Sequence, residues 1–298
     1  MFVKKYSKPS KYFYFFKTRV SGIIIFIFNK FIYGKYLNLI IQNNYNFLKK
    51  NKKVEKDIIE EVKIVFKELK NTLAPNAFTK DKFRQDCFHF QYLMVLKSLG
   101  FKPQNILEFG TYYGVTTSYM AYLWPNASIY SLDLPKNHYQ YKKYFPDNIS
   151  SIRENNLKSI KNKFKNVFYI RESSLKVNFE TFPEMDLIYL DGNHDFPLVS
   201  IDFFNSINCL NLDNKSKEKV IILDDVRPSF LCEIGFRLGN LDRMGMDHVY
   251  RSMKLYEEEF NLSFNLYKRD DRSNNQANSS FFIDPCCQAV YSNRKKYF

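Results

Sequence analysis

Residues 105–114 read Asn105-Ile-Leu-Glu-Phe-Gly-Thr-Tyr-Tyr-Gly114, an apolar run that leads through two glycines into the helical pattern of residues 115–123. This order predicts a strand, a tight loop and a helix. Gly110 lets the backbone turn sharply and approach a ligand, and Gly114 permits close packing where the helix begins. A dinucleotide-binding loop reads GxGxxG, but Glu108 stands at the position of its first glycine. The loop therefore argues against NAD and FAD, and its acid suits a cofactor that carries positive charge.

The chain around this loop alternates short β-rich runs with helical patterns, which is typical of repeated βα units and a mainly parallel sheet. Strands are expected at residues 105–108, 128–133, 167–171, 185–190, 219–223, 262–268 and 280–284. Amphipathic helices are expected to precede and cover that sheet. We predict three parts: a basic, aromatic N-terminal extension over residues 1–53, covering helices over residues 54–100, and an α/β domain over residues 101–298.

The second strand pattern ends in Asp133, which lies 25 residues after Glu108. A carboxylate at such a strand end can accept hydrogen bonds from both hydroxyls of a ribose. At this point the chain resembles the class I S-adenosylmethionine-dependent methyltransferases, whose first motif is E/D-x-G-x-x-x-G and whose second strand ends in an acid. Glu108, Gly110 and Gly114 match the first motif, and Asp133 matches the second.

The resemblance implies a Rossmann-like methyltransferase fold, in which a mainly parallel seven-stranded sheet has an antiparallel last strand and is flanked by helices. Here an N-terminal helical extension would be added to it. The resemblance also implies that S-adenosylmethionine is the cofactor. The residues implied to hold it are Glu108, Gly110, Thr111, Gly114 and Asp133.

The family often carries Gly-Asp after the third strand, where a polar side chain contacts adenine. This chain has Arg171-Glu-Ser-Ser174 at that place, so the usual pattern is broken. Ser173 is the candidate for the adenine contact. A capping role at the surface is the alternative for the two serines.

Two further apolar strand patterns end in acids, at Asp191 and at Asp224 and Asp225. The three carboxylates are expected to converge at the carboxyl edge of the sheet, where they repel one another unless a cation or protons compensate. A divalent ion such as Mg²⁺ suits oxygen ligands of this kind. The alternative is that one acid caps a helix or contacts a ribose and that no metal binds.

This spacing resembles the metal-dependent O-methyltransferases that act on catechols and caffeoyl-CoA, and a sugar O-methyltransferase group from macrolide biosynthesis. The resemblance implies that Asp191, Asp224 and Asp225 are the metal ligands, with Asp225 replacing an Asn common in the plant and animal enzymes. His194 completes an Asp-Gly-x-His segment and could remove the proton of an acceptor hydroxyl beside Asp191. Its alternative role is to cap a helix or to orient a metal ligand.

We therefore expect methyl transfer to a hydroxyl, with a sugar or glycan as the first acceptor and a small catechol-like phenol as the second. One rival is a non-catalytic cofactor-binding protein that docks through its basic N-terminal extension. Another is an RNA methyltransferase in which that extension binds phosphates. The sequence does not determine the oligomeric state.

The charge of the chain is concentrated at one end. Of the net +14, residues 1–53 contribute +12, from eleven Lys and Arg19 without any acid, so 14 − 12 leaves +2 for residues 54–298. A nearly neutral body argues against a nucleic-acid groove across it. The apolar run at residues 23–28 is shorter than the roughly 20 residues of a spanning helix. We expect residues 1–53 to lie on an anionic membrane surface or a partner, or to fold back onto the protein.

The cysteines indicate the compartment. There are five, an odd number, and none are spaced as a metal finger or redox pair. We expect a reducing, cytoplasmic location, with membrane contact restricted to the periphery of the inner surface.

Overall fold

The computed structural model describes residues 34–72, 90–193, 198–212, 214, 216–226, 262–268 and 287–294. Within them, the chain forms a seven-stranded sheet of order β3-β2-β1-β4-β5-β7-β6. The strands are β1 (Asn105–Phe109), β2 (Ser128–Asp133), β3 (Val167–Arg171), β4 (Leu187–Leu190), β5 (Val220–Val226), β6 (Ser263–Lys268) and β7 (Cys287–Ser292). The first five strands run parallel, and β7 lies antiparallel between β5 and β6.

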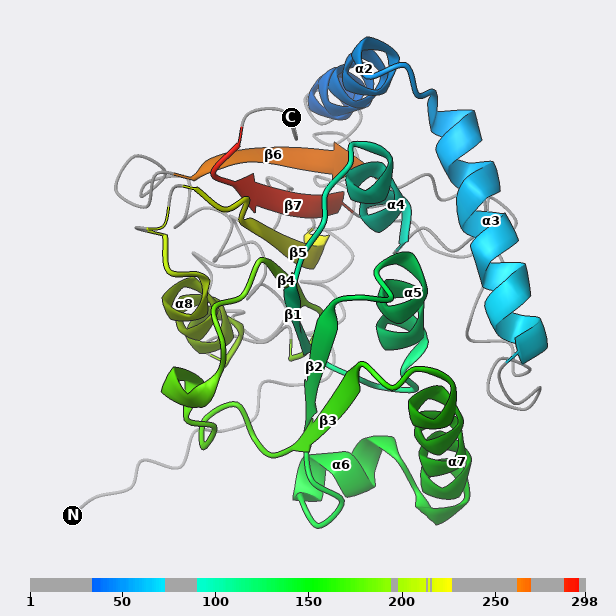
Figure 1. Cartoon of the computed structure of the whole chain (residues 1–298), viewed down its shortest axis with the longest axis vertical. Coiled ribbons are helices and arrows are strands. Elements are labelled where there is room, and N and C mark those ends of the chain that lie inside the picture. Colours follow the sequence, from blue (N-terminus) through cyan, green and yellow to red (C-terminus); the bar gives the residue numbers. More distant parts are fainter. Residues whose placement is uncertain are drawn as a thin grey trace, which may run out of the picture.

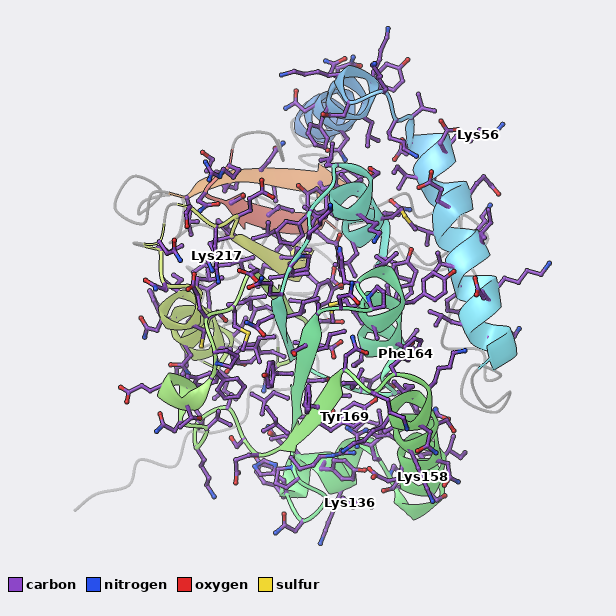
Figure 2. All side chains as sticks on the ribbon, in the orientation of Figure 1. Lys56, Lys136, Lys158, Phe164, Tyr169 and Lys217 are labelled. Atoms are coloured by element: carbon purple, nitrogen blue, oxygen red, sulfur yellow. The ribbon has the colours of Figure 1, made fainter. Side chains whose placement is uncertain are left out.

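Helices cover both faces of the sheet (Figure 1). They are α2 (Gly34–Lys50), α3 (Glu55–Thr72), α4 (Gln91–Ser98), α5 (Val115–Leu123), α6 (Tyr139–Tyr144), α7 (Asp147–Lys163) and α8 (Leu198–Leu210), with a short 3₁₀ turn, η4 (Phe179–Thr181). Buried residues of α3, α4, α5 and α7 pack with one side of the strands, and α8 and η4 pack with the other. Figure 2 shows Lys56 of α3 and Lys158 of α7 on the outside of the helical layer, where both are exposed.

Alternation of apolar side chains explains this two-sided core. Ile106 of β1 and Tyr189 of β4 contribute to the cluster under α4 and α5, whereas Leu107 and Leu190 contribute to the cluster under α8. Strands buried on both faces read as continuous apolar runs, because successive side chains point to opposite faces. The parallel strands end together at one edge, so the loops that follow β1, β2, β3 and β4 meet there.

The predicted fold class is confirmed, and six of the seven strands lie where the sequence placed them within two or three residues. The seventh strand was expected at residues 280–284, which lie outside the described residues, and β7 instead occupies Cys287–Ser292. Gln288 and Ser292 are polar but fully buried there. Because of these two polar residues, β7 lacks the continuous apolar run by which a buried strand is recognised in a sequence.

The end of the basic N-terminal extension is part of the fold. Phe47 and Leu48 of α2 belong to the same buried cluster as Ile58 and Val62 of α3. The division at residues 53 and 100 stays a prediction. Across the described helices, none combines the length and the apolar character that crossing a membrane requires.

Candidate functional site

The loop after β1 is built on Gly110. Its φ is +95°, and a Cβ at this position would lie 2.2 Å from the carbonyl oxygen of Asp191. The Gly110 N–H donates to the carbonyl of Leu132 at 2.9 Å, which ties the loop to the end of β2. Only glycine fits this conformation and this contact. Gly110 therefore joins the ends of β1, β2 and β4 in one compact edge.

Gly114 has a different role in the same loop. It precedes α5 with φ +77°, and an added Cβ would lie 2.6 Å from side-chain carbons of Leu157 and Ile160 on α7. Its lack of a side chain therefore lets α7 approach the first turn of α5. This is the close packing at the start of the helix that the sequence indicated.

Glu108 is fully buried between β1, β2 and α5. Its Oε2 accepts hydrogen bonds of 2.5 Å from Thr117 Oγ1 and Ser131 Oγ, and Ser131 also contacts the Thr111 hydroxyl at 2.6 Å. Glu108 Oε1 is buried and has no hydrogen-bond partner in the described part of the chain. Burial raises the pKa of Glu108 to about 8; the two hydroxyl donors lower it, and Asp191 and Asp133 raise it further. Glu108 is thus a buried acid next to two other acids.

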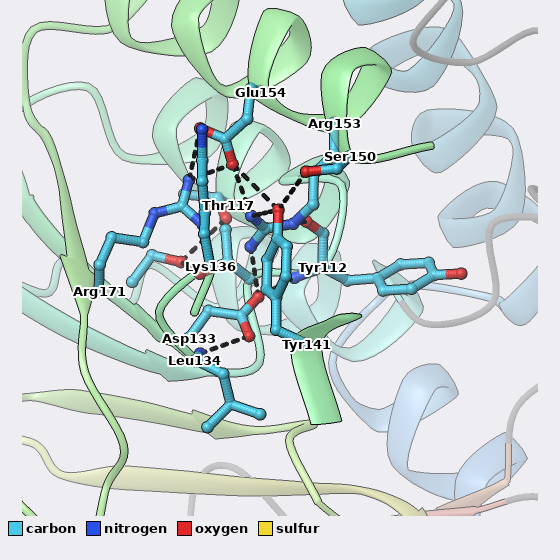
Figure 3. A network of polar contacts seen from close by, with 12 residues as sticks. Tyr112, Thr117, Asp133, Leu134, Lys136, Tyr141, Ser150, Arg153, Glu154 and Arg171 are labelled. Carbon is cyan, nitrogen blue, oxygen red and sulfur yellow. Dashed lines mark hydrogen bonds and ion pairs between the residues drawn. The ribbon is translucent and has the colours of Figure 1, made fainter. Parts of the chain in front are cut away.

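Asp133 lies at the end of β2 with both oxygens engaged (Figure 3). Oδ2 accepts from the Tyr112 N–H at 2.9 Å and from Arg153 Nη2 at 2.6 Å, and Oδ1 accepts from the Leu134 N–H at 2.7 Å. A carboxylate offers about four lone-pair positions, so these three donors leave one on Oδ1. The side chain is 15% exposed. It retains room for one hydroxyl of a ribose.

Arg153 of α7 was not predicted from the sequence. Its side chain is 0% exposed, its Nε donates to the Tyr112 carbonyl at 2.5 Å, and its Nη1 donates to Glu154 at 3.0 Å. The guanidinium also lies over the rings of Tyr141 and Phe145, 5.1 and 4.9 Å from their centroids. It holds Tyr112, which has a φ of +48°, together with Asp133. No local pattern in α7 indicates that this arginine turns inward.

A cleft of about 770 Å³ opens at this edge of the sheet. It is bordered by Gly110, Asp133 and Asp191 at the ends of β1, β2 and β4, by residues 172–175 after β3, and by Leu198 and Asp202 of α8. Its volume is that of a small-molecule site. Of the predicted cofactor residues, Gly110, Asp133 and Ser173 lie on the cleft, and Glu108, Thr111 and Gly114 are not among its lining residues.

The family comparison agrees with this arrangement. Residues 107–226 match a family model described as a methyltransferase domain. The same residues contain the Gly110 loop, Asp133 and the acids that end β4 and β5. Over this part of the chain they resemble the class I methyltransferases that the sequence motifs indicate. Enzymes of this class take their methyl group from S-adenosylmethionine.

Solved structures with a similar fold include three methyltransferases. An O-methyltransferase from Bacillus cereus, in complex with SAH, is 17% identical, with a TM-score of 0.48 over 78% of this chain and 99% of that one. An O-methyltransferase from Streptomyces achromogenes, involved in tomaymycin synthesis and in complex with SAM, is 12% identical, with a TM-score of 0.45 over 78% and 88%. A precorrin-6y C5,15-methyltransferase from Geobacter metallireducens is 14% identical, with a TM-score of 0.45 over 74% and 94%. No curated protein sequence matches the chain.

The predicted adenine contact of the methyltransferase domain, Ser173, lies in a turn after β3. Its hydroxyl accepts from the Leu175 N–H at 3.4 Å, and its own N–H donates to Glu172 Oε1 at 2.9 Å. Ser173 therefore makes the capping contact that was the alternative role, and it also borders the cleft. Its contact with adenine stays a prediction.

The three predicted metal ligands differ in position. Asp191 borders the cleft, but Asp224 is 0% exposed, is absent from the cleft lining, and accepts from Gln288 Nε2 at 3.0 Å. The side chain of Asp225 lies outside the described residues. No group of three His, Cys, Asp or Glu side chains suited to a metal occurs among the residues that the structure describes. The structure describes the side chains of Asp191 and Asp224 only, and the metal site stays a prediction.

The predicted base, His194, also lies outside the described residues. The preceding residues Gly192 and Asn193 border the cleft. His194 follows them directly in the chain, and its role as a base stays a prediction.

Proposed function

We propose that the methyltransferase domain transfers the methyl group of S-adenosylmethionine to a hydroxyl of a sugar, a glycan or a small molecule. The observation that carries the proposal is the pair of acids, Asp133 and Asp191, on either side of the Gly110 loop at a cleft of small-molecule size. S-adenosylmethionine offers a ribose hydroxyl as a donor to Asp133 and positive charge near Asp191. Coulomb attraction between opposite charges favours such a ligand in a partly dry cleft.

The proposed reaction is an in-line displacement. The acceptor oxygen forms a bond to the methyl carbon while the bond between that carbon and sulfur breaks, so the sulfonium becomes a neutral thioether. The hydroxyl proton leaves to a base, for which His194 is the candidate. Fixing the cofactor by its ribose and backbone contacts supplies the orientation that this displacement requires.

The acceptor is proposed from the Asp191 to His194 segment, which resembles that of sugar O-methyltransferases. A catechol-like phenol is the second choice. A divalent metal at Asp191, Asp224 and Asp225 would lower the pKa of an acceptor hydroxyl. The cytoplasmic location, and the contact of residues 1–53 with a membrane surface, likewise belong to the proposal.

Calorimetric titration of the folded chain with S-adenosylmethionine tests the central claim. We expect micromolar binding, and loss of that binding in Asp133→Ala with an unchanged circular dichroism spectrum. Unchanged binding in Asp133→Ala would contradict the ribose assignment, and absence of binding to the wild type would contradict the whole proposal. Repeating the titration with Mg²⁺ and then with a chelator tests the metal separately.

The acceptor is tested by transfer of a labelled methyl group to panels of sugars, glycans and phenols. We expect label on a hydroxyl oxygen, identified by mass spectrometry, and at least a hundredfold loss of rate in His194→Ala, within the range of general-base catalysis. Label transferred to RNA at low salt, and lost on deletion of residues 1–33, would favour the RNA methyltransferase instead.

A further inference from the structure

Asp202, on the second turn of α8, is a buried acid on the cleft that none of the sequence motifs includes. Asp202 is 5% exposed and borders the cleft. The side chain of Ser174 is hydrogen-bonded to its carboxylate, but among the residues that the structure describes no group pairs with Oδ1, which is covered from solvent. Buried carboxylate oxygens without a donor are rare, because burial removes their water without replacing it. An unpaired oxygen beside a cleft is explained when a ligand supplies the donor.

The position of Asp202 restricts what that ligand group can be. The cleft joins Asp202 and the 172–175 loop to Leu134 and Asp133, the end at which a ribose would be held. Figure 1 shows α8 and α7 on opposite faces of the sheet, so Asp202 and the Arg153–Asp133 pair approach the cleft from different layers. The nucleoside part that extends from the ribose is the base. The only hydrogen-bond donor that neutral adenine presents on its edge is the amine at C6.

We infer that Asp202 accepts a hydrogen bond from the exocyclic amine of the cofactor's adenine, in place of Glu172 in the loop after β3, whose Oε1 already accepts from the Ser173 N–H. This assignment rests on the proposed function, since it takes S-adenosylmethionine as the ligand. It makes Asp202 a specificity-determining residue: it favours an amine at C6 and opposes a carbonyl there.

The ionisation of Asp202 is consistent with this role. Burial raises the pKa of Asp202 to about 6, and the Ser174 hydrogen bond lowers it. At pH 7.5 the side chain is therefore mostly ionised and offers only acceptors. An amine at C6 matches an acceptor, whereas the carbonyl oxygen of hypoxanthine would place a second acceptor against it. Sites built around a buried polar group reject an analogue that lacks the matching group.

The competing explanation is that Asp202 only fixes the 172–175 loop through Ser174. Binding of S-adenosylhomocysteine and of its inosine counterpart, S-inosylhomocysteine, separates the two explanations. The titrations use the full chain at pH 7.5 with wild type, Asp202→Asn and Ser174→Ala. Ser174→Ala is the matched control, since it removes the Ser174 hydrogen bond and keeps the carboxylate.

We expect the wild type to bind the adenosine compound at least about tenfold more tightly than the inosine compound, the discrimination of one matched hydrogen bond. Asp202→Asn should reduce this ratio to about threefold or less, because an amide can accept from an amine or donate to a carbonyl. Ser174→Ala should keep the tenfold ratio. Equal binding of both compounds by the wild type, or the same loss of discrimination in Ser174→Ala as in Asp202→Asn, would overturn the inference and leave the proposed function intact. Failure of the folded wild type to bind either compound would overturn the proposed function, and the inference with it.

Discussion

Asp133 and Asp202 both border the cleft, but their carboxylates differ in how many partners they have. Asp133 accepts from two backbone N–H groups and from Arg153, whereas one oxygen of Asp202 has no donor within the described part of the chain. A fully supported acid is held in one orientation before any ligand arrives. An acid with an unpaired oxygen needs a hydrogen-bond donor from its ligand. The two regions of the cleft would therefore contribute orientation at the ribose and specificity at the base.

The buried acids behind the cleft also differ in how their charge is compensated. The Asp133 carboxylate lies against a buried cation, while Glu108 is surrounded by two hydroxyls and two other acids. Charge is therefore neutralised by Arg153 on the α7 side, whereas at Glu108 the raised pKa of about 8 lets a proton neutralise the carboxylate at neutral pH. Variants of each part should therefore respond differently in stability and in cofactor binding.

Gly110→Ala is expected to have the largest effect, since Gly110 connects both parts of the edge. The added Cβ would meet backbone of the Asp191–Gly192 segment, which cannot move independently of β4. We expect a loss of about 4 kcal/mol in the free energy of unfolding, as for severe backbone clashes. Urea denaturation measures it. Gly100→Ala is the control: its φ is +81°, but no atom of the described residues lies within 4 Å of its added Cβ, so strain alone should cost about 1 kcal/mol.

Arg153→Met removes the cation that holds Asp133. Breaking a buried ion pair on one side leaves the other charge uncompensated, so we expect a loss of about 3 kcal/mol in unfolding free energy and a cofactor affinity reduced at least about tenfold. Arg171→Met is the matched control, because Arg171 pairs with Glu154 and is 28% exposed. It should lose less than about 1 kcal/mol. Similar losses of stability in both variants would mean that the Arg153–Asp133 ion pair stabilises the fold no more than the partly exposed Arg171–Glu154 pair does.

How far the sequence predicts these features depends on where their signals lie. The Gly110 loop, Asp133 and six strands are encoded by adjacent residues, through glycine spacing and apolar runs. Arg153 and Asp202 were not predicted, because each belongs to a helix whose partner lies in a distant segment. The position of β7 was not predicted for a similar reason. Its Gln288 is buried because it pairs with Asp224 and Tyr189, which are 64 and 99 residues away in the sequence.

Glu108→Gln tests whether a proton compensates the buried acid. The pKa of Glu108 is about 8 in the folded chain and 4.5 as the ordinary value. A pKa raised by folding gives a stability contribution that is complete below pH 4.5 and is lost as the pH rises through 8. Between pH 5 and pH 7 the wild type should therefore lose about 2.5 kcal/mol relative to Glu108→Gln. Parallel stability curves for the two proteins over this range would contradict the raised pKa.

Ser173→Ala should have the smallest effect, and it bears on the division between orientation and specificity. The Ser173 hydroxyl accepts a long hydrogen bond from the Leu175 N–H at 3.4 Å, so its loss removes a weak turn contact. If Asp202 makes the adenine contact, Ser173→Ala should weaken S-adenosylhomocysteine binding by less than about threefold, since a weak hydrogen bond contributes under 1 kcal/mol. A tenfold loss, together with a reduced preference for adenosine over inosine, would move the base-recognition role from α8 back to the loop after β3. The titration would then favour Ser173, which the family resemblance indicates, over Asp202, which its burial and unpaired oxygen indicate.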